Sequence, residues 1–198
     1  APSPPSGVVQ WAIQAGGTSD DYASGIVADG AGGYFVTGYF TGTATFGSTT
    51  LARYSGDDIF AMRLSGSGVV QWAVRAGGTS YDFGYGIASD GAGGALVTGY
   101  FGGTATFGDT TLTSNGPYDV FVMRVSSAGA IEWAVQAGGS SVDFGGGIAS
   151  DGAGGALVSG VFSGTVTFGE TTLTNSGATE VFVMRVSSAG AEWAVRAG

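Results

Sequence analysis

The sequence predicts an all-β protein made of β-propeller-type blades, four-stranded antiparallel sheets in tandem. The main observation is a repeat, because tryptophans fall at spacings of 61, 61 and 60 residues, and residues 79–129 match residues 140–190 at 38 of 51 positions. A fixed period of this order is typical of stacked or circular repeat architectures. No window shows the 3.6-residue period of an amphipathic helix, and glycine and threonine recur too densely for helices.

The elements of one repeat follow in order along its central copy. Strands are predicted at 86–89, 95–101, 120–126 and 130–139. The Gly-Ala-Gly-Gly run at 91–94 predicts a tight turn between the first two strands. Residues 104–113 alternate threonine with apolar residues around a Gly-Asp turn, which predicts an inserted, exposed hairpin. Residues 120–126 are apolar on both faces, which predicts a buried strand.

A four-stranded sheet that is apolar on both faces cannot bury itself alone. Stacking such sheets face to face around an axis buries them, which is the propeller arrangement. The small residues Gly86, Ile87 and Ala88 suit an innermost strand, where blades crowd the axis. The bulky strand that holds Trp133 suits the wider outer part of the blade.

These motifs resemble a known repeat. The segments "GIASDGAGGALVTGYF", "DVFVMRV" and "EWAVQAGG" are similar to the SBBP-type β-propeller repeat of bacteria and archaea, and all three units match over 8–198. The Thr-rich hairpin and the reduced Gly-Ala-Gly-Gly turn depart from the family pattern. The resemblance implies propeller blades and an extracellular or cell-surface protein secreted by a prokaryote. It implies no specific activity.

The repeat divides the chain unevenly. A Pro/Ser-rich segment at 1–7 is typical of a linker or of an end left by signal cleavage. The repeats then occupy 17–77, 78–138 and 139–198, which leaves 8–16 as a surplus Trp strand that would complete another blade. Closed propellers have four to eight blades, so three are too few.

An unpaired strand and an unpaired sheet edge attract each other, and a head-to-tail contact closes a ring or grows a filament. We therefore expect a homo-oligomer or fibre that forms by exchange of terminal strands. The residues expected to carry this assembly are Val8, Val9, Trp11, Ile13, Trp193 and Val195.

Composition narrows the possible partners. The formal net charge is −9, with six arginines and neither lysine, histidine nor cysteine. This charge repels phosphate backbones and anionic lipids, so nucleic acid is not an expected partner. No apolar run reaches the ~20 residues of a membrane helix, so membrane insertion is not expected. Because the chain has no cysteine, it can form neither disulfides nor a thiolate nucleophile.

Repeated carboxylates are the candidate metal ligands. They are Asp21, Asp82 and Asp143 before the first strand, and Asp29, Asp90 and Asp151 at the Gly-rich turn. One interpretation is a site for Ca²⁺ or another hard cation, the single cofactor that the sequence suggests. The favoured interpretation is turn chemistry, in which aspartate accepts backbone N–H bonds.

A second set of charges repeats within the buried strand. The carboxylates are Asp58, Asp119 and Glu180, and the arginines are Arg63, Arg124 and Arg185, five positions later. Recognition of a carboxylate ligand is one interpretation. The favoured one is a structural ion pair, because a partly buried arginine needs a partner.

Two further features suggest binding. The tyrosines at 22, 39, 81, 85, 100 and 118 could stack on sugar rings, but the third unit has Val142, Gly146, Val161 and Thr179 instead. The Thr-x-Thr hairpins suggest O-glycosylation or a threonine array that orders water. The favoured interpretation is that threonine is simply a common residue of exposed strands, because its β-propensity is high.

Catalysis is not expected. Acid–base chemistry near neutral pH recruits histidine or carboxylates in unlike environments, and here histidine is absent and the carboxylates repeat. Two adjacent pairs, Asp20–Asp21 and Asp57–Asp58, are better explained as turn residues. The sequence therefore predicts a non-catalytic extracellular scaffold that self-assembles. The alternative is a multivalent carbohydrate- or cation-binding module.

Overall fold

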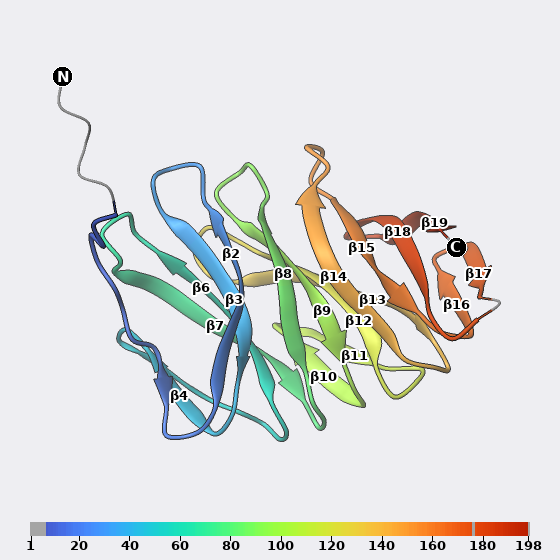
Figure 1. The fold of residues 1–198 in the computed structure, drawn as a ribbon, viewed down its shortest axis with the longest axis horizontal. Helices are drawn as coiled ribbons and strands as arrows, with labels where there is room; N and C mark the ends of the chain where they lie inside the picture. The colour runs from blue at the N-terminus through green and yellow to red at the C-terminus, as the bar shows by residue number, and fades with distance from the viewer. Residues whose placement is uncertain (1–6, 176, 198) are drawn as a thin grey trace.

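The computed structural model describes residues 7–175 and 177–197, and every regular element in them is a β-strand. Residues 1–6 of the expected Pro/Ser-rich segment lie outside the described residues. Three four-stranded antiparallel cores, here called sheets 1, 2 and 3, lie side by side in chain order (Figure 1). The described residues contain no helix long and apolar enough to cross a membrane.

The sheets are built from equivalent strands. Sheet 1 contains β2 (Asp21–Ala28), β3 (Tyr34–Phe40), β6 (Asp58–Leu64) and β7 (Val70–Gly78). Sheet 2 contains β8 (Phe83–Ser89), β9 (Ala95–Phe101), β12 (Asp119–Val125) and β13 (Ile131–Gly139). Sheet 3 contains β14 (Asp143–Ser150), β15 (Ala156–Phe162), β18 (Glu180–Ser187) and β19 (Gly190–Ala197). The four strands predicted for one repeat are confirmed.

A short hairpin is inserted between the second and third strands of each sheet. The hairpins are β4 (Thr43–Phe46) with β5 (Thr49–Ala52), β10 (Thr104–Phe107) with β11 (Thr110–Thr113), and β16 (Thr165–Phe168) with β17 (Thr171–Thr174). Threonines point outward from them, whereas alternate apolar side chains such as Ala105 and Phe107 are buried. The expectation of an exposed hairpin therefore holds for only one of its two faces.

The hairpins also join consecutive repeats. The Gly-Gly end of β7 pairs with β10, with Gly77 opposite Thr106 and Gly78 opposite Ala105. A side chain at Gly78 would lie 2.0 Å from the Thr104 carbonyl oxygen, so only glycine allows this approach. The result is a six-stranded sheet, β11-β10-β7-β6-β3-β2, and a second in the next repeat. The prediction of four-stranded sheets is thus correct for each core but misses this connection.

The hydrophobic core lies between the sheets. One buried cluster joins sheets 1 and 2 through residues such as Phe35, Ile59 and Phe121. A second joins sheets 2 and 3 through residues such as Leu96, Val120 and Phe182. The two central strands of sheet 2, β9 and β12, are therefore buried on both faces, which explains why their sequences are largely apolar.

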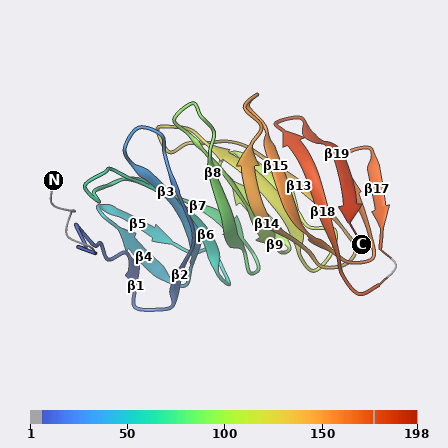
Figure 2. The ribbon, with the colours of Figure 1, turned by 45° about the horizontal axis from the view of Figure 1, so that its top comes forward.

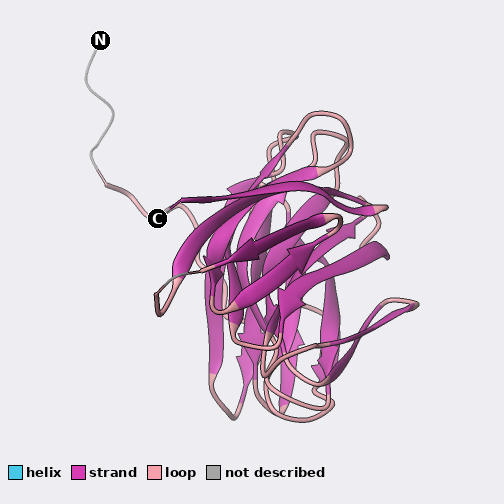
Figure 3. Ribbon diagram, turned by 90° about the vertical axis from the view of Figure 1, so that its right-hand side faces the viewer, coloured by secondary structure: helices cyan, strands magenta, loops and turns pink. Residues whose placement is uncertain are grey.

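The array is open at both ends. Sheets 1 and 3 lie at opposite ends of the row in two views (Figures 1 and 2), and the view from the sheet 3 end shows only strands and loops (Figure 3). Each end sheet thus has a neighbouring sheet on one face only.

The surplus Trp strand differs from the prediction. Residues 8–15 form no strand, and only Gly16–Gly17 (β1) pairs with β4, as Gly77 and Gly78 pair with β10. A strand needs a partner edge, and the equivalent strand β7 finds its edge on β6. No strand edge in the described residues takes that role for 8–15, so the expected strand is not formed there.

Candidate functional site

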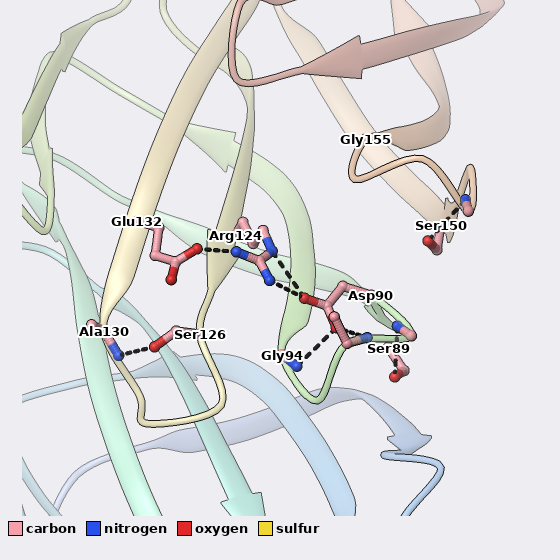
Figure 4. Close-up of polar contacts among 12 residues, drawn as sticks. Ser89, Asp90, Gly94, Arg124, Ser126, Ala130, Glu132, Ser150 and Gly155 are labelled. Atoms are coloured by element: carbon pink, nitrogen blue, oxygen red, sulfur yellow. Dashed lines mark hydrogen bonds and ion pairs between the residues drawn. The ribbon is translucent and has the colours of Figure 1, made fainter.

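The aspartates of the Gly-rich turns are fully engaged within each sheet. Asp90 Oδ1 accepts hydrogen bonds from the amides of Ala92 and Gly94, at 2.7 and 2.8 Å. Its other oxygen accepts two bonds from Arg124, at 2.9 and 2.6 Å (Figure 4). Arg124 also contacts Glu132. The amide and guanidinium donors lower the pKa of Asp90 against the opposing effect of its burial.

The same arrangement recurs in the other two sheets. Arg63 pairs with Asp29, and Arg185 pairs with Asp151, both at 2.6 Å. In each case the arginine on the third strand reaches the turn between the first two strands, 34 positions earlier. The predicted turn role of these aspartates is therefore seen in all three repeats.

The ion pairs predicted between strand neighbours are wrong in their partners. Arg63 does not pair with Asp58, because residues five positions apart on a strand point to opposite faces. Asp58 instead pairs with Arg75 at 2.8 Å, and Glu180 pairs with Arg196 at 2.9 Å.

In the middle repeat the equivalent carboxylate, Asp119, has neutral hydrogen-bond partners, because Gln136 stands at the position of Arg75. There the Asp119 carboxylate accepts hydrogen bonds from Asn115 and Gly116. Arg124 pairs with Asp90 and not with Asp119, and Arg185 pairs with Asp151 and not with Glu180.

The aspartates before the first strand hold the Gly-Gly ends. Asp82 accepts hydrogen bonds from the amides of Gly78 and Gly102, at 2.7 and 3.1 Å. Asp143 accepts the amide of Gly139 at 2.8 Å, and Asp21 accepts that of Gly17 at 2.7 Å.

Burial makes these carboxylates unusual. Desolvation raises the pKa of Asp82 to about 7 and that of Asp143 to about 6. It also raises the pKa of Asp58 and of Asp119, which lie on the neighbouring strand beside Gly77 and Gly138, the first glycine of each Gly-Gly end. The carboxylates of Asp58, Asp82, Asp119 and Asp143 thus accept backbone amides, although burial disfavours the charged form of all four.

Cation binding finds no preformed site in the part of the chain that the structure describes. No group of three or more acidic side chains is arranged there to hold an ion. Three of the six candidate ligands lie in the Gly-rich turns, and the other three hold the Gly-Gly pair that precedes each of them in the chain. Each of the six accepts at least one backbone amide hydrogen bond.

The outward face of sheet 3 exposes large apolar side chains. Leu157 is 38% exposed and Val181 is 45% exposed, whereas their counterparts Leu96 and Val120 in sheet 2 are 0% exposed. Trp193 and Val195 are also exposed large apolar side chains of β19. We call this surface the sheet 3 end face, and it presents the residue types that are covered by the next sheet elsewhere in the array.

The outward face of sheet 1, at the other end of the row, also exposes an apolar side chain. Ile26 is 66% exposed there, and its counterpart Ile87 at the junction of sheets 1 and 2 is 9% exposed. A hollow of about 420 Å³ opens beside it, lined in part by Trp11, Phe60 and Met62. We call this surface the sheet 1 end face.

Trp11 marks where a preceding sheet would lie. Its indole Nε1 donates to the Gly66 carbonyl at 3.0 Å. Trp72 of sheet 1 makes the same bond to the Ser127 carbonyl of sheet 2, also at 3.0 Å. The segment 8–15 therefore contacts sheet 1 as the outer strand of one sheet contacts the next, although it forms no strand itself.

The candidate assembly residues thus divide between the two ends. Exposed side chains at the N-terminal end are Val8, Val9 and Ile13, with Trp11 partly buried, and those at the C-terminal end are Trp193 and Val195. Leu157, Val181 and Ile26 belong to the same surfaces and were missed. Comparison of each position with its equivalents 61 residues away would have found them, because those equivalents lie in strands that are apolar on both faces.

The repeated aromatic residues form a continuous row. Ring contacts connect Tyr22 with Tyr39, Tyr39 with Phe83, and Phe83 with Tyr100. The row continues from Tyr100 to Phe144 at 4.4 Å and thus passes across all three sheets. In sheet 3 it ends, since glycine and valine replace the tyrosines.

The chain was also compared with known proteins. No protein-family model and no curated protein matches it.

Proposed function

We propose that this protein is a non-catalytic structural protein that assembles head to tail with copies of itself. The sheet 3 end face of one copy would cover the sheet 1 end face of the next. The observation that carries the proposal is the exposure of Leu157 and Val181 at positions that are completely buried in the other sheets. Exposed apolar surface of this kind marks a site of protein association.

The two internal junctions supply the geometry of this contact. Ile59 of sheet 1 approaches Gly84 of sheet 2, and Val120 of sheet 2 approaches Gly145 of sheet 3 in the same way. One period further, Val181 would approach residue 23 of the next copy, which is Ala23. At the internal junctions a Cβ atom on Gly84 or Gly145 would also lie 2.5 or 2.4 Å from the hydroxyl of Thr37 or Thr98. Ser159 stands at this threonine position in sheet 3, so its hydroxyl must turn away, or the two copies must lie further apart, to admit the methyl group of Ala23.

The proposed contact also gives the segment 8–15 a partner. An assembled junction has room for one Trp strand, yet β19 and 8–15 both have the sequence for it. In the exchange we propose, residues 8–17 of one copy replace β19 on the edge of β18 in the preceding copy. The chain would then run from this strand through β1 into pairing with β4, as it runs from β7 into pairing with β10.

The shape of the product depends on the rotation between copies. A head-to-tail contact closes into a ring or continues as a filament. The similarity of the sheets to propeller blades favours a ring, because full closure removes open faces. We also propose an extracellular location, which suits a strongly acidic chain without cysteine.

Charge at the sheet 3 end face tests the proposal. Val181→Glu places a carboxylate where the next copy must exclude water, so the assembly should dissociate to the mass of a single chain in light scattering on a sizing column. Thr111→Glu is the matched control, because Thr111 is exposed on a hairpin away from both end faces. The proposal is wrong if the unmodified chain has the mass of a single copy at every concentration, or if Val181→Glu leaves the assembly intact.

Trp11→Ala separates strand exchange from simple stacking. If residues 8–17 supply the exchanged strand, loss of the indole weakens the assembly. If the segment only occupies the sheet 1 end face, its removal uncovers that face and the assembly becomes stronger, which would contradict the exchange.

A further inference from the structure

The repeat symmetry breaks at one place along the aromatic row, between sheets 2 and 3. A hollow of about 480 Å³ lies there, a volume typical of small-molecule sites. Tyr85, Tyr100 and Phe144 form its aromatic wall. Gly146 and Val161 form the side where the row ends. This hollow lies at an internal junction, and it borders the sheet 3 end face where Val161 pairs with Val181.

The equivalent place between sheets 1 and 2 is filled by protein. There Phe83, the counterpart of Phe144, has its ring 6.4 Å from that of Tyr85 and 4.9 Å from that of Tyr100. The two tyrosine rings are themselves 5.6 Å apart. One period later these tyrosines become Gly146 and Val161, so Phe144 has no aromatic neighbour at these positions of its own sheet and contacts the rings of Tyr100 and Tyr118 of sheet 2.

The missing side chains leave real space. Gly146 lies in a β-bulge of β14, and a Cβ atom there would meet only the Ser159 carbonyl oxygen, at 3.7 Å. Gly145 next to it is different, because its Cβ would lie 2.4 Å from Thr98 Oγ1. The bulge position is therefore the one that directs a side chain into the hollow, as Tyr85 shows in the preceding sheet.

We propose that this hollow binds the planar six-membered aromatic ring of a small phenolic molecule. The ring would stack on Phe144 and Tyr100 in the place that tyrosine rings occupy at the preceding junction. Aromatic rings prefer offset or edge-to-face contacts with centroids about 4.5–7 Å apart, which the existing row already shows. The hydroxyl of Tyr85 or of Tyr100 can hydrogen-bond the hydroxyl of the phenol, as the two tyrosines interact with each other.

The probe is 4-methylphenol, which is the side chain of tyrosine, titrated into the full chain by calorimetry and by saturation-transfer NMR. The expected result is saturable binding to one site per chain. Gly146→Tyr restores the ring that the preceding sheet has, and it should weaken binding at least about tenfold. Ser24→Tyr is the matched control, because it adds the same ring at the equivalent exposed position of sheet 1, and it should leave the affinity unchanged.

Ring chemistry is tested with two ligands of similar size. 4-Methylcyclohexanol keeps the hydroxyl but is not planar, and methyl glucoside presents a polar pyranose ring. Both should bind more weakly than 4-methylphenol. The proposal is overturned if 4-methylphenol shows no saturable binding, if Gly146→Tyr binds it as the unmodified chain does, or if the glucoside binds more tightly. None of these results depends on self-assembly, because Ile26→Glu, which places a charge on the sheet 1 end face away from the hollow, should bind the phenol unchanged.

Discussion

Lowering the pH from about 8 to about 5 should stabilise this protein, which is unusual for an acidic chain that relies on ionised carboxylates. Burial raises the pKa of Asp82 to about 7 and that of Asp143 to about 6. A carboxyl whose pKa is higher in the folded state favours folding fully below its unfolded pKa, near 3.9, and this contribution is lost as the pH rises through the folded value.

The magnitude follows from these values. Between about pH 5 and about pH 8, the proton linkage destabilises the fold by roughly 2.6 kcal/mol through Asp82 and roughly 1.4 kcal/mol through Asp143. For a chain of this size, the sum of ~4 kcal/mol corresponds to a melting temperature about 10 °C higher at the lower pH. Asp58 and Asp119 act in the same direction, because burial raises their pKa as well.

The carboxylates with a lowered pKa have the opposite effect on stability, but this effect does not change between about pH 5 and about pH 8. Donors from arginine and from the turn amides lower the pKa of Asp29, Asp90 and Asp151. Their stabilising contribution is complete above an ordinary aspartate pKa and is lost only as the pH falls through the lowered values. Stability should therefore be greatest in mildly acidic solution and decline on both sides.

The assay is thermal unfolding by circular dichroism at a series of pH values. Asp82→Asn removes one titrating group while its side-chain carbonyl still accepts the Gly78 amide, so more than half of the pH dependence should disappear. Asp109→Asn, in an exposed hairpin turn, should keep the full dependence. A melting temperature that rises from about pH 5 to about pH 8, or an unchanged slope in Asp82→Asn, would refute the reasoning.

Three further pairs of substitutions test the internal structure by urea unfolding. Arg124→Met leaves the buried carboxylate of Asp90 without its guanidinium partner and should lower the free energy of unfolding by about 2 kcal/mol. The exposed Arg53→Met should lower it by less than about 0.5 kcal/mol. Equal losses would contradict the role of the pair. Gly99→Ala places a methyl group 1.9 Å from the Phe83 carbonyl oxygen and should lower the free energy of unfolding by about 3 kcal/mol. In Gly146→Ala the methyl group meets nothing closer than 3.7 Å, so the free energy of unfolding should change by less than about 1 kcal/mol. A tolerated Gly99→Ala would show that the strands can separate there. Val120→Glu should prevent folding because Val120 is completely buried, and Val181→Glu should not; a folded Val120→Glu would contradict the equivalence of the two positions.

The sequence was sufficient for the elements within each repeat. The 61-residue period, the Gly-rich turn and the run apolar on both faces predict strands such as β9 (Ala95–Phe101) and β12 (Asp119–Val125) within a residue or two of their observed bounds. These features are local, since strand propensity, turn chemistry and burial pattern act over a few neighbouring residues.

Contacts between repeats were not predictable in the same way. The pairing of Gly77 with Thr106 and that of Arg124 with Asp90 depend on which strands become neighbours, and local patterns carry no such information. The five-residue spacing of Asp58 and Arg63 suggested an ion pair, although strand geometry places the two on opposite faces. For the candidate site, the terminal Trp segments were found from their spacing, whereas Leu157 and Val181 were recognised from the burial of their equivalents in sheet 2.

A cross-link between copies tests head-to-tail assembly most directly, because the chain contains no cysteine of its own. Ala23→Cys and Val181→Cys are prepared as separate proteins, mixed, and oxidised under mild conditions. At the internal junctions a Cβ atom on Gly84 or Gly145 would lie 3.1 or 3.0 Å from a γ-methyl carbon of Ile59 or Val120, so we expect the two cysteines to approach closely enough for a disulfide. We predict a disulfide-linked pair that contains one chain of each variant and does not form when Thr111→Cys replaces Val181→Cys. If the Ala23→Cys and Val181→Cys chains do not link to each other, the end faces do not meet and the proposed assembly is wrong.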